Sequence, residues 1–180
     1  LNDPDYSLWD WSYYFPAAAS VFPEGSDALL LGLGGGTLVK QFGRLGFNLD
    51  VIEIDERVKN VAIEFFSVDP KKYDMISLDL FLNETPPAHV MSVESFSRLK
   101  ELLNPGGMVM MNFYGYVTGD LGHASRCVYT TFQAAGFDTK LFVTPGSEAG
   151  RNLIFLACTG NTDFTNTTYS EPGLPVLGDI

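Results

Sequence analysis

The sequence is short of positive charge and of metal-ligating side chains. Its 180 residues hold 11 Lys and Arg against 22 Asp and Glu, with two Cys and two His. A protein that binds phosphates needs basic stripes, so this balance argues against nucleic acid as the main partner. Cys127 and Cys158 form no CxxC pair and no Cys/His cluster, which argues against a structural zinc. We therefore expect no metal, and a reducing, cytoplasmic compartment.

Long apolar runs are missing as well. No run approaches the roughly 18 residues that a membrane-spanning helix needs. The chain starts at Leu1 rather than Met, and we take it to be a partial chain with room for further elements upstream. A hydrophobic fraction of 46% is nevertheless enough to bury a core, and the length suits one domain.

Short apolar runs and helical patterns alternate along the chain. Runs typical of buried strands lie at 28–33, 49–54, 73–80 and 108–113. Apolar residues at helical spacing mark 37–45, 57–66, 93–103 and 125–135. The alternation predicts an α/β, Rossmann-like fold with a mostly parallel, doubly wound sheet. Two final strands, 139–144 and 152–159, have no helix between them, which predicts an antiparallel hairpin at the end of the sheet.

The same patterns divide the chain into three parts. Residues 1–27 form an aromatic-rich lead-in, with a helix expected to cover the sheet. Residues 28–160 hold the α/β domain. Within that domain the run NPGG at 104–107 is a strong stop signal between a helix and the next strand. The tail 161–180 is rich in Thr, Asn, Gly and Pro and is expected to be irregular.

A glycine-rich turn joins the first predicted strand to the first helix of the domain. Its glycines are Gly32, Gly34, Gly35 and Gly36. Glycines at this place let the backbone turn tightly and let a ligand approach without meeting Cβ atoms. Glu53 and Asp55 end the next strand, where a carboxylate can accept hydrogen bonds from both ribose hydroxyls. The combination predicts a nucleoside site, and the alternative is a tight turn with no ligand.

The order of the glycines favours one class of nucleoside. Dinucleotide sites usually read GxGxxG, and the stretch from Gly32 to Thr37 lacks the final glycine. The glycines instead match GxGxG, which resembles the S-adenosylmethionine-type site of class I methyltransferases. That ligand has no pyrophosphate, so a helix N-terminus suited to phosphate is not required.

Further motifs extend this resemblance in a fixed order. LLLGLGGGTL is followed by VIEIDERV, YDMISLDLFLNETPPAHVMSVESF and LNPGGMVMMNF. Over about residues 10–160 they resemble the spermidine synthase (polyamine aminopropyltransferase) family, and most of all its bacterial spermidine-synthase-like branch. The resemblance implies a seven-stranded methyltransferase-like sheet and a homodimer. It also implies transfer of an aminopropyl group from decarboxylated S-adenosylmethionine to an amine such as putrescine.

The resemblance assigns roles to individual residues. Asp79, at the end of its strand, would bind the acceptor amine and help to deprotonate it. Glu84 would be a second carboxylate facing this cationic acceptor, and Glu53 would bind the ribose. Tyr13 falls near a tyrosine that lines the acceptor site in the family. From the residues alone, Asp79 could instead cap the following loop, and Glu84 could be a solvated loop charge.

Three departures from the family pattern keep other functions open. Gly34 stands where spermidine synthases usually have an Asp that meets the donor's amine, and Leu82 stands where they tend to have a second Asp. The usual spacing of strand and helix units also predicts about twenty further residues between Pro70 and Lys71. Either the sequence lacks an unobserved stretch there, which we favour, or the protein has lost an edge strand.

Three hypotheses follow for the function. The leading one is a spermidine-synthase-like transferase that uses decarboxylated S-adenosylmethionine or S-adenosylmethionine itself. The second is an S-adenosylmethionine-dependent methyltransferase on the same fold, which Gly34 favours. The third is a degenerate, non-catalytic domain that binds a nucleoside, or nothing, and serves in assembly. A longer, membrane-anchored parent protein also remains open, since relatives in this branch can follow transmembrane segments.

Overall fold

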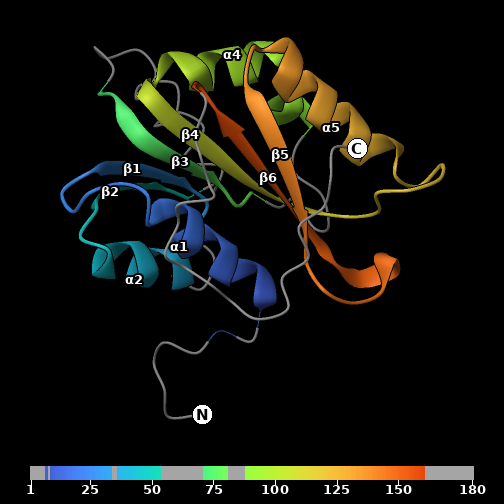
Figure 1. Cartoon of the computed structure of the whole chain (residues 1–180), viewed down its shortest axis with the longest axis horizontal. Coiled ribbons are helices and arrows are strands. Elements are labelled where there is room, and N and C mark those ends of the chain that lie inside the picture. Colours follow the sequence, from blue (N-terminus) through green and yellow to red (C-terminus); the bar gives the residue numbers. More distant parts are fainter. Residues whose placement is uncertain (1–6, 8, 34–35, 54–70, 81–87, 161–180) are drawn as a thin grey trace.

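The computed structural model describes residues 7, 9–33, 36–53, 71–80 and 88–160, and a six-stranded sheet lies at the centre of this part (Figure 1). The strands are β1 (Asp27–Leu31), β2 (Asn48–Ile52), β3 (Tyr73–Leu78), β4 (Leu103–Tyr114), β5 (Asp138–Val143) and β6 (Asn152–Cys158). Their order across the sheet is β2-β1-β3-β4-β6-β5. β1 to β4 pair in parallel, whereas β6 runs antiparallel to both β4 and β5. The predicted α/β fold and its closing hairpin are confirmed.

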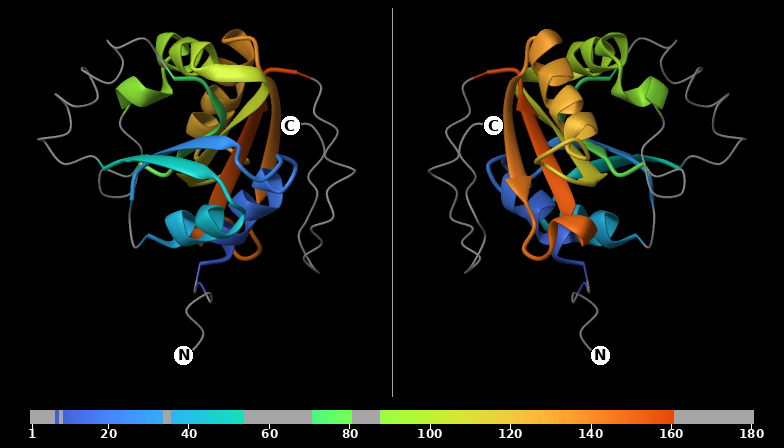
Figure 2. Two further views of the ribbon diagram at one scale, coloured as in Figure 1. Left: turned by 90° about the vertical axis from the view of Figure 1, so that its left-hand side faces the viewer. Right: turned by 90° about the vertical axis from the view of Figure 1, so that its right-hand side faces the viewer.

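Helices cover both faces of the sheet (Figure 2). One face carries the 3-10 helix η1 (Asp10–Tyr13) with α1 (Tyr14–Ala19) and α2 (Thr37–Arg44), and the other carries α4 (Val93–Glu101) and α5 (His123–Ala134). Two short 3-10 helices, η2 (Ala88–Met91) and η3 (Glu148–Gly150), lie in connections. Alternate residues of each central strand therefore enter opposite apolar clusters, as expected for a sheet buried on both sides.

The aromatic lead-in is part of the core. In α1 the side chains of Phe15 and Ala19 are fully buried against the sheet, together with Phe42 of α2. The Trp11 ring packs edge-on against Phe15 at 5.7 Å between centroids. The expected covering helix is thus confirmed, and α1 contributes to the same hydrophobic core as the strands.

The opposite face is organised around an aromatic stack. The rings of Phe96 in α4 and Phe132 in α5 lie 3.8 Å apart and are nearly parallel. Ser92 caps the first turn of α4 by accepting a hydrogen bond from the Ser95 amide at 3.2 Å, as Ser does at this position. This cap and the stack hold both helices on the side of the sheet away from α1.

Two features differ from the sequence-based expectation. The NPGG run does not precede the strand, because β4 already begins at Leu103 and the run bulges out of it. Tyr73 pairs with Leu103, but Met75 pairs with Met108, so β4 carries extra residues that β3 does not match. Pro105 has no amide hydrogen to donate and Gly106 adopts a positive φ of 80°, which suits a bulge rather than regular pairing.

The number of strands also differs from what the resemblance implies. The described residues form six strands rather than seven, with β2 at one edge. The helix expected at 57–66, the proposed gap between Pro70 and Lys71, and the tail 161–180 lie outside the described residues. Within the described residues, no helix has the length and apolar character needed to cross a membrane.

The lead-in helix provides a test of this arrangement. Phe15→Ala should lower the free energy of unfolding by about 3–5 kcal/mol, because it empties a buried aromatic position. Trp9→Ala is the matched control, since the Trp9 side chain is 64% exposed and its loss should change stability by about 0.5 kcal/mol or less. Urea unfolding of the two variants measures both values. Equal, small effects would contradict the packing of α1 into the core.

Candidate functional site

The carboxyl ends of the parallel strands meet at one edge of the sheet, where open α/β sheets bind ligands. Asp79 directly follows β3 at this edge, and its amide donates a hydrogen bond to the Leu31 carbonyl of β1 at 2.9 Å. Asp79 is only partly exposed. The backbone bond continues the β1–β3 pairing by one residue and holds the carboxylate next to the glycine turn.

Gly32 makes this approach possible. It has a φ of 100°, and its amide donates a hydrogen bond to the Ile52 carbonyl at 2.7 Å. A Cβ at this position would lie 2.2 Å from the carbonyl oxygen of Asp79, which no side chain can tolerate. The first glycine of the turn is therefore required by the contact between β1 and the end of β3, in addition to any ligand.

The rest of the turn is partly described. Gly36 is the N-terminal cap residue of α2 and has a φ of 74° in the left-handed region, which favours glycine. Gly34 and Gly35 lie outside the described residues, so their predicted contact with a nucleoside stays a prediction. Gly32 and Gly36 place a strand end and a helix start on either side of that gap.

Glu53 lies beside the glycine turn. Its Oε2 accepts a hydrogen bond from the Leu33 amide at 2.5 Å. The predicted ribose-binding acid is therefore held against the turn by the backbone of the turn itself. Its role toward a ribose stays a prediction, and Asp55, predicted at the same place, lies outside the described residues.

Two asparagines that the sequence analysis did not select form a hydrogen-bonded chain that ends on the predicted base. The Asn112 side chain in β4 donates from Nδ2 to Oδ1 of Asp79 at 3.0 Å. Asn152, the first residue of β6, donates from Nδ2 to Oδ1 of Asn112 at 2.9 Å. Asn112 is 1% exposed. The signal that could have identified it is a polar residue after Met108 and Met110 on the same face of a buried strand.

These contacts act on the proton affinity of Asp79 in opposite directions. Burial raises the pKa of the Asp79 carboxyl above its usual value, the hydrogen bond from Asn112 lowers this pKa, and the charge of Glu53 raises it. Burial has the largest effect, and the net shift of the Asp79 pKa is upward. A carboxylate with a raised pKa at the ligand-binding edge is a candidate general base.

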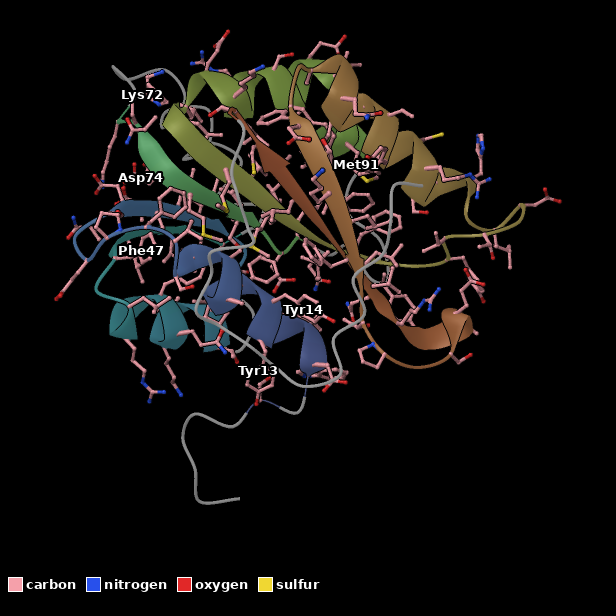
Figure 3. The ribbon with its side chains drawn as sticks, viewed as in Figure 1. Tyr13, Tyr14, Phe47, Lys72, Asp74 and Met91 are labelled. Carbon is pink, nitrogen blue, oxygen red and sulfur yellow. The ribbon has the colours of Figure 1, made fainter. Side chains whose placement is uncertain are left out.

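The structure separates the two tyrosines at the start of α1. The Tyr13 hydroxyl is hydrogen bonded to the backbone of Ser7, accepting from its amide at 2.9 Å and donating to its carbonyl at 3.0 Å. Tyr14 is 5% exposed, and its hydroxyl lies 3.5 Å from the Val143 carbonyl at the end of β5. Figure 3 shows both tyrosines far from Asp74, which marks the amino end of β3.

No described contact joins Tyr13 to Asp79, so its predicted place in an acceptor pocket stays a prediction. Glu84, predicted to face the same acceptor, lies outside the described residues. Among the described residues, no three His, Cys, Asp or Glu side chains are grouped closely enough to hold a metal. The candidate site therefore consists of Asp79, Gly32, Glu53 and the two asparagines.

The contact between Gly32 and Asp79 can be tested with a matched pair of variants. Gly32→Ala should destabilise the fold by several kcal/mol, because its Cβ would overlap the Asp79 carbonyl. Gly25→Ala is the control: Gly25 also has a positive φ, of 88°, but open space around it, so we expect only the conformational cost of about 1–2 kcal/mol. Thermal unfolding of both variants gives the comparison. Equal losses of stability in the two variants would show that the close approach of Gly32 to Asp79 does not exclude a side chain.

The raised pKa of Asp79 predicts a cost in stability. The folded state binds the Asp79 proton more tightly than the unfolded state does, so stability falls as pH rises from about 4, the unfolded pKa, through the folded pKa. Asp79→Asn keeps an oxygen for Asn112 and removes the charge. It should therefore raise the melting temperature at pH 7, by about 2–4 °C per kcal/mol recovered.

The same substitution should lose this advantage below both pKa values, at about pH 3. Asp138→Asn provides the control, because the Asp138 side chain at the start of β5 is half exposed and its removal should be near neutral. Differential scanning calorimetry at both pH values measures the effect. A lower melting temperature for Asp79→Asn at pH 7 would contradict the raised pKa.

Known transferases of two kinds are similar to this chain in sequence. No known family profile matches the chain. It is 30% identical over 115 residues to a probable polyamine aminopropyl transferase of Bifidobacterium longum, and 29% identical over 135 residues to a polyamine aminopropyltransferase of Vibrio vulnificus. It is also 28% identical over 116 residues to an N-terminal histidine N-methyltransferase of Emericella nidulans.

Each of these alignments spans only part of both chains. They cover 53%, 58% and 52% of this chain, and 26%, 45% and 21% of the respective relatives. The chain therefore spans less than half the length of each of these relatives.

Solved structures agree in fold. A probable spermidine synthase from Corynebacterium glutamicum superposes with a TM-score of 0.71 at 18% identity, covering 93% of this chain and 70% of that one. A Burkholderia thailandensis N1-methyltransferase with bound S-adenosylhomocysteine gives a TM-score of 0.59 at 13% identity, covering 83% and 76%. The resemblance is thus confirmed: this chain is similar in sequence to polyamine aminopropyltransferases and has the class I methyltransferase fold found in spermidine synthases.

Proposed function

We propose that the chain carries the active site of a spermidine-synthase-like transferase, which moves an aminopropyl group from decarboxylated S-adenosylmethionine to a polyamine such as putrescine. The observation that carries this proposal is the placement of Asp79. It is a partly buried carboxylate with a raised pKa, held beside the glycine turn by a backbone hydrogen bond to Leu31. The sequence relatives named as aminopropyltransferases support the reaction class.

The chemistry requires such a group. An alkyl ammonium has no lone pair and a pKa of about 10, so it must lose a proton before it can attack carbon. Asp79 would accept that proton. The amine nitrogen then forms a bond to the carbon next to the sulfonium, the carbon–sulfur bond breaks, and sulfur keeps the electron pair as methylthioadenosine. Each unit by which the Asp79 pKa rises reduces the unfavourable proton transfer by about 1.4 kcal/mol.

The donor would lie over the glycine turn. The resemblance assigns Glu53 to the ribose, and the structure holds this carboxylate at the Leu33 amide. One oxygen of Glu53 is used in that contact, which leaves the other to accept from ribose hydroxyls. The donor is a co-substrate here, consumed in each turnover.

The acceptor would be a small cation. The net charge of −11 would favour the approach of a polyamine to the protein, and Asp79 gives it a carboxylate at the site. A homodimer and a longer, membrane-anchored parent protein stay predictions from the family resemblance, and a cytoplasmic location stays a prediction from the cysteine content.

A methyltransferase is the second candidate. It is favoured by Gly34, because a glycine at this position supplies no carboxylate to the amine of the decarboxylated donor, and by the sequence similarity to a histidine N-methyltransferase. The base at Asp79 would serve this reaction equally well, because an N-methyl acceptor must also lose a proton. The two reactions differ in which carbon of the sulfonium is attacked, and so in the nucleoside released.

Product analysis separates the candidates. The protein is incubated with putrescine and, separately, with decarboxylated S-adenosylmethionine or S-adenosylmethionine, and the nucleosides are measured by mass spectrometry. Methylthioadenosine together with spermidine supports aminopropyl transfer. S-adenosylhomocysteine together with a methylated acceptor supports methyl transfer instead. If neither product forms and calorimetry detects no donor binding, the degenerate domain is the hypothesis that remains.

Asp79→Asn tests the residue that carries the proposal. It should lower kcat by about 10²- to 10⁴-fold, the usual contribution of a general base, with little change in donor affinity. Asp138→Asn makes the same chemical change at the start of β5, away from the carboxyl edge, and should leave kcat unchanged. Unaltered turnover in Asp79→Asn would remove Asp79 as the base.

A further inference from the structure

Three strands present a polar residue at the same edge and on the same face of the sheet. On β3 this face carries Met75, Ser77 and then Asp79; on β4 it carries Met108, Met110 and then Asn112; on β6 it carries Asn152 and then Ile154, Leu156 and Cys158. The hydrophobic members of these rows pack under α1 and α2. The polar row thus begins where the buried apolar face reaches the ligand-binding edge.

The hydrogen bonds along this row have a direction. The backbone amide of Asn152 donates to Oγ1 of Thr144 at 3.0 Å, and the backbone amide of Thr144 donates to the backbone carbonyl of Asn152 at 3.0 Å. These two bonds hold Asn152 at the end of the β5–β6 hairpin. From there Asn152 donates to the Asn112 oxygen, and Asn112 donates to Asp79. An amide oxygen cannot donate a hydrogen bond. If the side-chain amide of Asn112 were flipped, its oxygen would face the Asp79 carboxylate and the hydrogen bond between them would be lost.

We propose that Asn112, oriented by Asn152, is a positioning residue that holds Oδ1 of Asp79 and leaves Oδ2 as the oxygen that takes the proton of the acceptor amine. Within the described residues, Asn112 is the hydrogen-bond partner of the Asp79 side chain, and Oδ2 has none. The proton moves from the ammonium nitrogen to Oδ2, giving a neutral amine and a neutral carboxylic acid. This inference rests on the proposed function.

Two neutral amides suit this task better than a cation would. An Arg or Lys beside Asp79 would lower the pKa of the carboxyl by about 1–3 units and make it a weaker base. Asn112 fixes the carboxylate through one hydrogen bond and adds no charge. A base that is held in one rotamer also keeps its oxygen oriented toward the acceptor amine, and reactions between well-oriented groups are faster.

The pKa of Asp79 depends on the groups that face it from the neighbouring strands. β1 contributes the backbone of Leu31 and Gly32, while β4 and β6 contribute the neutral amides of Asn112 and Asn152. The end of β2 contributes Glu53, the one charged side chain of the described part that acts on the Asp79 pKa. Removal of the Asn112 amide should therefore raise the Asp79 pKa further, because the hydrogen bond that favours the ionised form is lost.

The test uses Asn112→Leu, which keeps the number and branching of the side-chain heavy atoms and removes the amide. The Asp79 carboxyl is titrated by ¹³C NMR, and its pKa should move upward from the wild-type value. In the assay, the acid limb of the kcat–pH profile should move to higher pH, because the base must be ionised. The maximal kcat should nevertheless fall roughly 10- to 100-fold, because the carboxylate is no longer held in one orientation and this loss outweighs its greater basicity.

Two further variants complete the design. Asn152→Ala leaves Asn112 in place but removes its orientation, so it should shift the Asp79 pKa in the same direction by a smaller amount; it also replaces Asn112→Leu if that variant does not fold. Ser77→Ala is the control, because Ser77 lies on the same face of β3 with a buried hydroxyl that has no hydrogen-bond partner among the described residues. It should leave both the pKa and the profile unchanged.

The outcomes separate this inference from the proposed function. If the wild-type protein transfers neither group, the proposed function fails, while the NMR titration still reports whether Asn112 acts on Asp79. If the protein is active and Asn112→Leu and Asn152→Ala both titrate like the wild type, the positioning role is overturned and the transferase proposal stands. The positioning role would also be overturned if the Asp79 pKa in Asn112→Leu shifted only as much as it does in Ser77→Ala.

Discussion

The close approach of β1 to the end of β3 is the constraint on which the candidate site depends. Gly32 lies so near the Asp79 carbonyl that a Cβ would overlap it, and the Leu31 carbonyl accepts the Asp79 amide at 2.9 Å. These contacts fix the backbone of Asp79 before any side chain acts. Because the glycine turn starts at the same residue, the turn and the candidate base are positioned by one piece of backbone. A shift in either would move the other.

The position that makes Asp79 useful also makes it costly. Burial raises the pKa of its carboxyl, so the ionised form that a base needs is the form that the fold disfavours near neutral pH. Asn112 offsets part of this cost through its hydrogen bond. The ionised carboxylate of Asp79 therefore destabilises the folded state, and the buried aromatic core on both faces of the sheet offsets this cost. Such local costs are typical of functional sites.

The sequence predicted what repeats along the chain and missed what depends on a bulge or on strand order. Short apolar runs sufficed for the strands, and the position of Asp79 at a strand end followed from them. The aromatic residues of the lead-in sufficed for the covering helix. The NPGG run was read as a stop, because sequence alone does not show that β4 resumes pairing with β3 after a bulge. Tyr13 and Tyr14 are neighbours, and only the path from η1 into α1 shows that Tyr14 is the buried one.

Asn112 and Asn152 illustrate the same limit most clearly. They lie 40 residues apart, and each follows or precedes an ordinary apolar run. They meet because β6 enters the sheet antiparallel between β4 and β5. In that direction the start of β6, rather than its end, lies at the carboxyl edge of the parallel strands. The hairpin that ends the sheet therefore brings Asn152 to Asn112, which reaches the base from the side opposite to Gly32. The reversal of one strand thus completes a site that parallel strands begin.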